Sequence, residues 1–280
     1  MDSTSSSSKF IDIEEVIRNK NPKLLKALPM FLIRYLKRVI HQDDLNDIIE
    51  NNRDVYGVDF VRKALQMFGT VCTVKGVENV PKEGRFIFAS NHPLGGLDGL
   101  ILISEAGRLF PNVKFVVNDL LMNVKNLESV FVPVNKHGRQ SADYARIIDD
   151  AYASDDQILY FPAGLCSRKI KGQVIDLVWH KSFISKAVKY KRDIIPVYVE
   201  GRNSNFFYGL ANFRKKLGIK VNIEMLYLVD EMFKQKGKSI QVVFGAPVSY
   251  TQFDSSKTSS DWATFIREKV YAMKPALSSI

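Results

Sequence analysis

The most informative part of this chain is residues 86–99, which read Phe-Ile-Phe-Ala-Ser-Asn-His-Pro-Leu-Gly-Gly-Leu-Asp-Gly. A short apolar run ends in polar residues and leads into a loop rich in glycine, which carries His92 and Asp98. This pattern is typical of a buried strand in an α/β protein that presents polar groups at its carboxyl end. A histidine with a nearby carboxylate is the smallest general-base unit, because imidazole accepts a proton near neutral pH and the acid stabilises the imidazolium.

Three further stretches repeat this design of an apolar strand followed by a turn. Residues 158–169 read Ile-Leu-Tyr-Phe-Pro-Ala-Gly-Leu-Cys-Ser-Arg-Lys, and residues 130–139 read Val-Phe-Val-Pro-Val-Asn-Lys-His-Gly-Arg. Residues 194–199, Ile-Ile-Pro-Val-Tyr-Val, form another apolar run. Because cations follow two of these strands, we expect one base and several positive charges at the same edge of the sheet. Such a site suits a substrate with a hydroxyl and an anionic group.

The spacing of the apolar runs predicts the fold class. Strands are expected at 86–89, 113–117, 130–134, 157–161, 194–199, near 221–227 and at 240–244, and helices at about 98–108, 140–153, 179–190 and 261–273. This alternation predicts an α/β fold with a mixed, largely parallel sheet covered by helices. Upstream, residues 12–68 carry helical patterns in which Pro22 and Pro29 mark helix starts, so we expect a helical N-terminal prefix.

The chain divides into three segments on this basis. Residues 1–8 are a polar, serine-rich stretch that we expect to be a disordered tail, residues 9–69 form the helical prefix, and residues 70–280 form the main domain. In the prefix, the three cations Arg34, Lys37 and Arg38 share one helical stripe opposite bulky apolar residues. This helix is a candidate for lying in anionic lipid headgroups, and the alternative is a core-packed helix with a charged outer face.

Composition limits the classes of partner and compartment. The formal charge of +10 and the pI near 9.4 favour an anionic partner. Two cysteines give neither a disulfide framework nor a metal-ligand spacing, which fits a reducing cytosol. Residues 1–8 do not have the pattern of a signal peptide, and no apolar run approaches the length of a membrane span. We therefore expect a cytoplasmic protein that meets a bilayer only from its surface.

Four motifs in a fixed order resemble those of a known family. They are Asn91-His92 with Asp98, residues 130–136, Phe161-Pro162-Ala163-Gly164 with Ser167-Arg168, and Ile195-Pro196-Val197. The set resembles the glycerolipid (lysophospholipid) acyltransferase family, in which the second and third motifs are Gly-x-x-Pro-Ile-Asp-Arg and Phe-Pro-Glu-Gly-x-x-Ser. The resemblance covers roughly residues 70–250, and the ordered set is much more specific than any single motif.

Two departures from the family pattern point to one of its branches. Five residues separate His92 from Asp98, where the family usually has four, and Ala163 stands where most members have Glu. Both variations resemble the hemolysin-related branch of bacterial acyltransferases, which complete ornithine- or glycine-type aminolipids. Gly95 and Gly96 give the longer loop room to bulge. Whether His92 and Asp98 are in contact is therefore left open by the sequence.

The resemblance implies an activity and a set of roles. Residues 70–280 would be an acyltransferase domain that moves a fatty acyl group from an acyl carrier protein or coenzyme A thioester to the hydroxyl of a lysolipid. His92 would be the general base, and Asp98 would orient it. Substrate-binding roles are implied for Lys136, Arg139, Gly164, Ser167 and Arg168. We expect no metal and no cofactor, and we expect the protein to work peripherally on the inner face of the cytoplasmic membrane.

Two other functions remain as alternatives. The acceptor could be 1-acylglycerol-3-phosphate, the substrate of the general family, in place of a lyso-aminolipid. A protein of another class, a non-catalytic basic module that binds membrane or nucleic acid, also fits the charge. The sequence contains no zinc pattern, RNA-binding aromatic signature or recognition-helix motif, so we expect no nucleic-acid partner.

Overall fold

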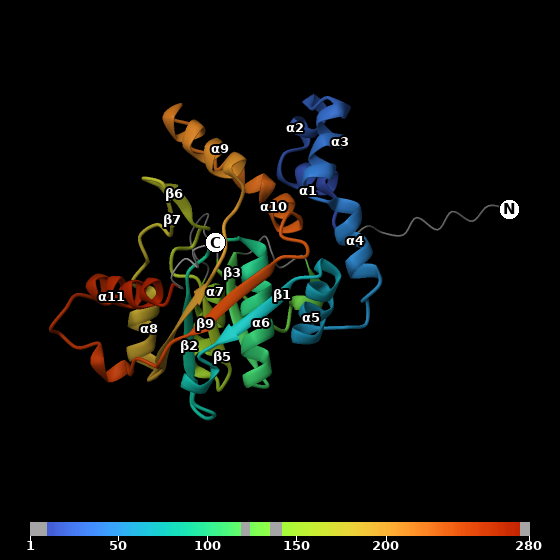
Figure 1. Cartoon of the computed structure of the whole chain (residues 1–280). Helices are drawn as coiled ribbons and strands as arrows, with labels where there is room; N and C mark the ends of the chain where they lie inside the picture. Colours follow the sequence, from blue (N-terminus) through green and yellow to red (C-terminus); the bar gives the residue numbers. More distant parts are fainter. Residues whose placement is uncertain (1–9, 119–123, 135–141, 275–280) are drawn as a thin grey trace.

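The computed structural model describes residues 10–118, 124–134 and 142–274 of the chain. In these residues one seven-stranded sheet forms the centre of the molecule, with helices packed on both of its faces (Figure 1). The expected α/β class, with a mixed, largely parallel sheet covered by helices, is therefore confirmed. The expected tail at 1–8 and the two predicted substrate-binding residues Lys136 and Arg139 lie outside the described residues.

The sheet has the strand order β1-β9-β8-β2-β5-β3-β4. Its strands are β1 (Val71–Lys75), β2 (Phe86–Ser90), β3 (Val113–Asn118), β4 (Phe131–Val134), β5 (Gln157–Tyr160), β8 (Asp193–Val199) and β9 (Ser239–Phe244). All neighbours pair in parallel except β8 and β9, which are antiparallel. Five strands therefore end at one edge of the sheet, and β1 and β9 end at the opposite edge. A separate antiparallel hairpin is formed by β6 (Arg168–Ile170) and β7 (Gln173–Ile175).

Strand β2 lies near the middle of the sheet and is buried along its whole length. Phe86 and Phe88 pack into the apolar core on one face, and Ile87 and Ala89 pack into the core on the other. The first core is closed by α5 (Gly57–Phe68) and α6 (Gly96–Leu109), and the second by α7 (Ala142–Ala153), α8 (Ser182–Tyr190) and α11 (Ser259–Ala272). Burial on both faces explains why this strand is a continuous apolar run.

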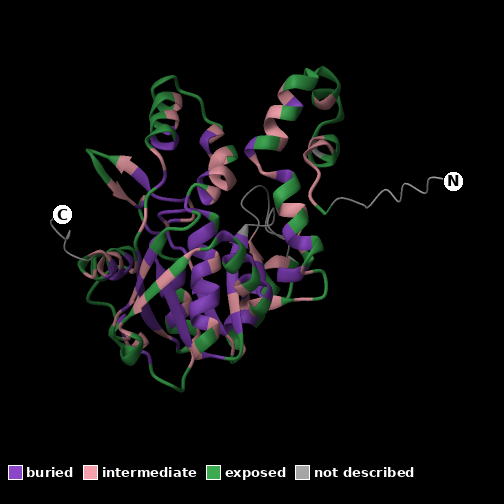
Figure 2. Cartoon of the chain, turned by 45° about the vertical axis from the view of Figure 1, so that its right-hand side comes forward, coloured by how far each residue is buried: buried purple, intermediate pink, exposed green. Residues whose placement is uncertain are grey.

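Helices outside these layers rise from one end of the molecule in two groups (Figure 2). One group is the N-terminal prefix, which confirms the expected helical start: α1 (Ile13–Lys20), α2 (Pro22–Ala27), α3 (Met30–Val39) and α4 (Gln42–Glu50). The other group is α9 (Asn205–Lys216), the 3₁₀ helix η4 (Ile223–Tyr227) and α10 (Leu228–Phe233). Shorter 3₁₀ turns are η1 (Val77–Asn79), η3 (Lys125–Leu127) and η5 (Tyr250–Gln252).

The expected strand near 221–227 is wrong. This segment begins with alternating apolar and polar residues, which predicts a strand, but residues 223–227 form the 3₁₀ helix η4, which leads into α10. The reason is the carboxylate of Glu224, which is fully buried and accepts hydrogen bonds from Arg168 and Arg214. These two arginines come from the hairpin and from α9, so they hold the segment beside those elements and away from the sheet edge.

Arg192 is a fully buried cation that joins α7 to the sheet. Its Nε donates to the carbonyl of Tyr152 at 2.7 Å, and its Nη1 donates to the carbonyl of Asp156 at 2.7 Å. Its Nη2 donates to the carbonyl of Ser154. These carbonyls belong to the end of α7 and the turn into β5, where no helical partner remains for them. Burial lowers the pKa of Arg192 to about 10, so it remains charged at neutral pH.

Substituting Arg192→Met should destabilise the fold, because three carbonyls would lose the donor that a fully buried guanidinium supplies. We expect the free energy of unfolding to fall by about 2–4 kcal/mol, measured by urea denaturation. Arg146→Met is the matched control, since Arg146 is an exposed residue of α7, and it should change the free energy by less than about 0.5 kcal/mol. Equal effects of the two substitutions would contradict this role of Arg192.

Candidate active site

The candidate site begins at the carboxyl end of β2, where the side chain of the next residue, Asn91, extends the hydrogen bonding of the sheet. The amide Nδ2 of Asn91 donates to the carbonyl of Val199 at 2.8 Å, and the N–H of Val199 donates to the Asn91 Oδ1 at 2.7 Å. This reciprocal pair joins the ends of β2 and β8. The pair takes the place of one further backbone pair between the two strands, so the backbone of the chain can turn at His92.

His92 lies at this turn with its ring held on two sides. Its Nδ1 is 3.1 Å from both carboxylate oxygens of Asp98, and its ring stacks on Phe161, with centroids 4.0 Å apart. The side chain keeps 16% of its surface exposed, whereas that of Asp98 is fully buried. Within the described part of the chain, no polar group bonds to the ring's Nε2. The carboxylate therefore fixes a proton on Nδ1 and leaves Nε2 as the basic nitrogen.

The loop absorbs its extra residue through Gly95, which has a φ of 80°. A Cβ at this position would stand only 2.8 Å from the Leu228 side chain, so glycine is needed both for the conformation and for the close approach. Helix α6 then starts at Gly96, and Asp98 lies in its first turn, where its carboxylate also accepts from the N–H of Leu94 at 2.8 Å. The helix thus starts two residues earlier than expected, with Gly95 at the N-cap position.

A second buried acid, Asp176, supports the loop from behind, and sequence reasoning missed it. Its Oδ1 accepts from the N–H of His92 at 3.2 Å and from the hydroxyl of Ser167 at 2.5 Å, and its Oδ2 accepts from the indole of Trp179 at 2.9 Å. Burial raises the pKa of Asp176, although these hydrogen bonds act against the rise. The available signal was an acid directly after the short apolar run Val174-Ile175, which is weak on its own.

Ser167 connects the third motif to the same loop. Its N–H donates to the carbonyl of His92 at 2.6 Å, so the two motifs are joined through the backbone as well as through Asp176. Gly164 has a φ of 64°, and its N–H donates to the carbonyl of Phe161 at 3.0 Å, which closes the turn after β5. Cys166 is fully buried, and burial raises the pKa of its thiol to about 11, so the thiolate is scarce at neutral pH.

Arg168 lies in a buried cluster of charges beside this loop. Its Nη2 is 2.9 Å from the Glu224 carboxylate, and its Nη1 donates to the Cys166 carbonyl at 2.7 Å. Arg214 binds the same carboxylate through its Nε at 2.6 Å. Two guanidinium groups thus share one carboxylate, and the cluster keeps one net positive charge near the third motif.

Among the described residues no group of three or more histidine, cysteine, aspartate or glutamate side chains could hold a metal ion. The arrangement of His92 and Asp98 is that of an acid–base pair. With Nδ1 bound to a buried carboxylate, the pair can take a proton from a hydroxyl at Nε2 and return it to a leaving group.

Comparison with known proteins identifies the family of the chain. Residues 15–279 match the acyltransferase family, and the chain belongs to that family. It is 47% identical over 265 residues to a lyso-glycine lipid O-acyltransferase of Bacteroides thetaiotaomicron, a match that spans 94% of this chain and 97% of that protein. A lyso-glycine lipid O-acyltransferase of Phocaeicola vulgatus is 44% identical over 265 residues, spanning 94% of this chain and 95% of its own.

A crystal structure of the 1-acyl-sn-glycerophosphate (LPA) acyltransferase from Thermotoga maritima aligns with 93% of this chain and 99% of its own length, at 17% identity and a TM-score of 0.47. The match to the family and the two relatives confirm the resemblance inferred from the four motifs. The protein is an enzyme of the acyltransferase class, which excludes the non-catalytic basic module as its function.

The charge cluster predicts a specific dependence of stability on pH. Burial raises the pKa of Glu224, but hydrogen bonds from Arg214 and the charge of Arg168 outweigh it, so that the pKa lies below its ordinary value. The unfolded state then binds the proton more readily, and the stability that ionised Glu224 contributes is lost as pH falls below about 4.5. Glu224→Gln should lower the free energy of unfolding by about 3 kcal/mol at pH 7. As the pH falls below about 4.5, the variant should lose less stability than the wild type.

Urea denaturation between pH 3 and 7 measures this difference. Glu78→Gln is the control, because Glu78 is exposed and makes no contact of this kind in the described structure. The control should follow the wild-type pH profile, and a Glu224→Gln profile parallel to the wild type would contradict the argument.

Proposed function

We propose that this enzyme transfers a fatty acyl group from an acyl carrier protein or coenzyme A thioester to the hydroxyl of a lyso-aminolipid of the glycine type. The observation that carries the reaction is the contact between His92 Nδ1 and Asp98 at the end of β2, in a chain of the acyltransferase family. The names of the two relatives, at 44–47% identity over 94% of the chain, support this acceptor over 1-acylglycerol-3-phosphate.

In the proposed mechanism His92 acts through Nε2. This nitrogen takes the proton of the acceptor hydroxyl as its oxygen attacks the thioester carbonyl carbon. Asp98 stabilises the imidazolium that forms. The tetrahedral intermediate then collapses, the carbon–sulfur bond breaks, and the imidazolium returns its proton to the leaving thiolate. The products are the acylated lipid and a free thiol, so the proposed reaction balances without a cofactor.

We assign stabilisation of the oxyanion to the amino end of α6. The first amides of a helix have no acceptor within it, and the fourteen-residue helix α6 begins at Gly96 beside His92. The N–H of Gly164, which also lies in a turn at the end of a strand, already donates to the carbonyl of Phe161, which favours the α6 amides. In the proposal Gly164 keeps a substrate-binding role by shaping the turn after β5.

The anionic part of the acceptor is assigned to the basic end of the site. The proposed ligands are Ser167, Arg168 and the two residues outside the described structure, Lys136 and Arg139. Support for Arg168 comes from its cluster, in which two arginines share one carboxylate and retain a positive charge. Arg168 also follows Ser167 directly, and Ser167 is bonded to the His92 backbone.

The enzyme is proposed to reach its acceptor from the membrane surface, as a peripheral protein on the inner face of the cytoplasmic membrane. No helix in the described residues combines the length and the apolar character that a membrane span requires. In α3, Phe31 is 68% exposed and Met30 is 59% exposed, although both side chains are large and apolar. Phe31, Leu32, Tyr35 and the cations Arg34 and Arg38 line a shallow cavity of about 570 Å³. Exposed apolar side chains beside cations favour an interface with anionic lipid.

His92→Ala should lower kcat by about 10²–10⁴-fold, because the reaction would lose its general base. The rate is measured with purified protein, an acyl carrier protein thioester and lyso-glycine lipid, with the product identified by mass spectrometry. Asp98→Asn should also lower kcat, since the neutral amide stabilises the imidazolium less well.

The control for this experiment is His180→Ala, which removes an exposed histidine that precedes α8. It should keep the wild-type rate. Near-normal activity of a folded His92→Ala protein would overturn the mechanism. Faster product formation from lysophosphatidic acid than from lyso-glycine lipid would overturn the proposed acceptor and leave the mechanism intact.

Arg168→Gln should raise the KM for the lysolipid by about tenfold and change the KM for the thioester much less, because the lost charge is assigned to the acceptor. Arg168→Lys keeps the charge and the pairing with Glu224, so it should restore much of the affinity. A rise confined to the KM for the thioester would place Arg168 in the donor site. Circular dichroism shows whether each variant is folded.

A further inference from the structure

Helix α9, which the sequence analysis did not predict, has two apolar faces. Phe207, Tyr208 and Ala211 are buried against the rest of the protein. On another face, Phe206, Leu210, Phe213 and Leu217 follow the spacing i, i+4, i+7 and i+11, which places them along one stripe. In this stripe Phe206 is 52% exposed, Phe213 is 60% exposed and Leu217 is 57% exposed. Most of this second apolar face is therefore left uncovered by the described part of the chain.

The segment that follows α9 extends this apolar surface and adds charge. Ile219 and Val221 are exposed apolar residues, and Val221 is 70% exposed. Lys215, Lys216 and Lys220 are exposed between them. We call these exposed side chains of residues 213–221 the tip. Glu224 is the only acid between residues 205 and 226, and it is buried and paired with two arginines, so the surface charge of this segment is entirely cationic.

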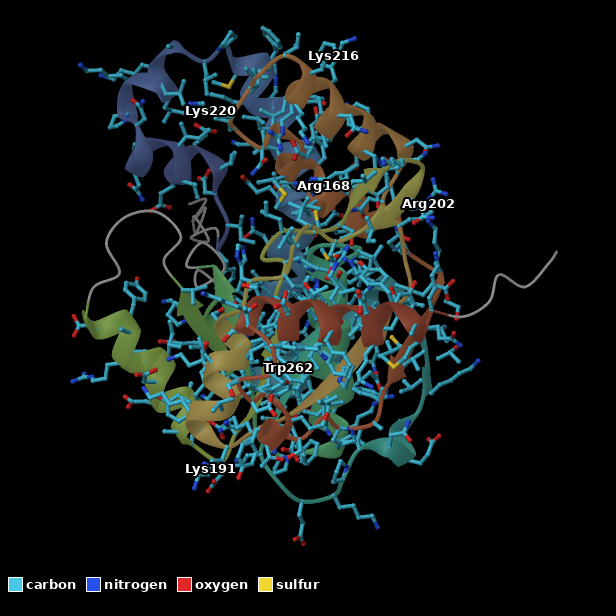
Figure 3. The ribbon with its side chains drawn as sticks, turned by 90° about the vertical axis from the view of Figure 1, so that its left-hand side faces the viewer. Arg168, Lys191, Arg202, Lys216, Lys220 and Trp262 are labelled. Atoms are coloured by element: carbon cyan, nitrogen blue, oxygen red, sulfur yellow. The ribbon has the colours of Figure 1, made fainter. Side chains whose placement is uncertain are left out.

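The tip lies at the same end of the molecule as the active site. Helix α9 follows the carboxyl end of β8, and β8 runs parallel to β2, whose carboxyl end leads to His92. Figures 1 and 2 show α9 and the helices α1 to α3 as two groups that both rise from this end. In Figure 3, Lys216 and Lys220 lie at the end of the molecule opposite Lys191.

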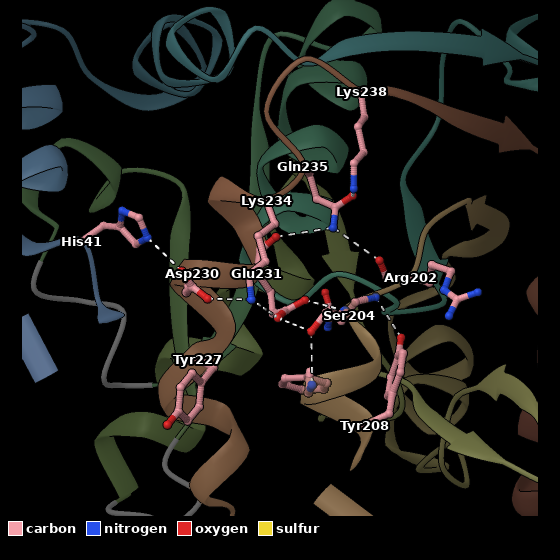
Figure 4. A network of polar contacts seen from close by, with 12 residues as sticks. His41, Arg202, Ser204, Tyr208, Tyr227, Asp230, Glu231, Lys234, Gln235 and Lys238 are labelled. Atoms are coloured by element: carbon pink, nitrogen blue, oxygen red, sulfur yellow. Dashed lines mark hydrogen bonds and ion pairs between the residues drawn. The ribbon is translucent and has the colours of Figure 1, made fainter. Parts of the chain in front are cut away.

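Contacts through η4 and α10 hold these parts together. The hydroxyl of Tyr227 in η4 is 2.8 Å from that of Tyr35 in α3, and its ring contacts Phe206 of α9 edge-on at 5.0 Å. Figure 4 shows the polar contacts of α10, in which Asp230 binds His41 at 3.2 Å and Glu231 binds the hydroxyl of Ser204 at 2.6 Å. The tip, α3 and the active-site end therefore belong to one packed unit.

We propose that the tip is a second membrane-docking surface, which binds an anionic bilayer together with α3 and turns the active-site end toward it. The inference deepens the proposed function, because it rests on an acceptor that resides in a membrane. The tip alternates exposed apolar side chains with lysines, so apolar groups can enter the interface while the ammonium groups stay at the headgroups. An acidic protein partner would complement the charge of the lysines, but it would not explain why Phe213, Leu217 and Val221 are exposed.

The first test is sedimentation with vesicles, in the absence of any substrate. In the triple variant Lys215→Gln, Lys216→Gln, Lys220→Gln, affinity for vesicles that contain anionic lipid should fall by roughly 100-fold, since each surface lysine contributes about fivefold. Lys75→Gln, Lys82→Gln, Lys191→Gln is the matched control. These lysines are exposed and lie at the opposite end of the strands, so this variant should keep the wild-type affinity.

The second test asks whether the apolar stripe enters the bilayer. The native tryptophans Trp179 and Trp262 are buried, so a Phe213→Trp variant carries one exposed indole. Its emission should shift to the blue on addition of anionic vesicles and should be quenched by brominated acyl chains. Val188→Trp, at an exposed apolar position of α8, should show neither effect.

Three outcomes would overturn the proposal: an equal loss of vesicle binding in the two lysine variants, an unshifted emission of the Phe213→Trp variant, or unchanged vesicle binding with a higher KM for the acyl carrier protein thioester. The last outcome would assign the tip to an acidic carrier protein. Turnover of a short-chain, water-soluble acceptor should survive in the tip variant. If the wild type itself lacks that activity, the proposed function fails, while the vesicle result still decides the docking surface.

Discussion

Both faces of strand β2 are buried in apolar cores, and the arrangement of the site follows from this constraint. Phe88 and Ile87 are fully buried in opposite cores, and the strand pairs on both edges with β5 and β8. Polar groups can therefore emerge only where the strand ends. There the side chain of Asn91 completes the ladder to β8, and the chain turns at His92. A rigid strand end gives the imidazole a fixed position, which a general base needs.

Buried carboxylates connect the other parts of the molecule to this centre. Asp98 and Asp176 hold the ring and the backbone of His92, and Glu224 holds the hairpin and α9 together. Each of these acids is almost fully withdrawn from water, which is costly unless its oxygens are fully used. Every one of them accepts two or more hydrogen bonds. Through Glu224, contacts of the same kind also set the position of α9 relative to the hairpin beside the site.

Sequence patterns predicted the centre of the fold and the helical prefix well, and the segment from α9 to η4 poorly. Apolar runs such as 86–89 and 194–199 were found because a strand buried on both faces is apolar throughout. Helix α9 was missed because its apolar residues occupy two faces, so no single amphipathic period stands out. The 221–227 segment alternates like a strand, but the hydrogen bonds of Glu224 to Arg168, 56 residues away, and to Arg214, 10 residues away, outweigh that local preference.

The residues of the candidate site were also predicted only in part from the sequence. Local sequence was enough to select His92 and Asp98, since the loop between them is short and ends in a helix start. Asp176 could not be selected, because it lies 84 residues from His92 and follows only a weak strand pattern. Arg168 was selected as a cation of the third motif, but its pairing with Glu224, 56 residues away, was not visible.

The sequence alone determined which segments are buried, where strands end in polar loops, and which family the four ordered motifs resemble. These properties depend on residue type and spacing along the chain. Only the tertiary structure decided that β8 and β9 run antiparallel, that Asp176 supports His92, and that one apolar face of α9 stays largely uncovered. These properties depend on which distant segments meet, because pairing and coverage are set by the packing of the whole chain and leave little trace in local sequence.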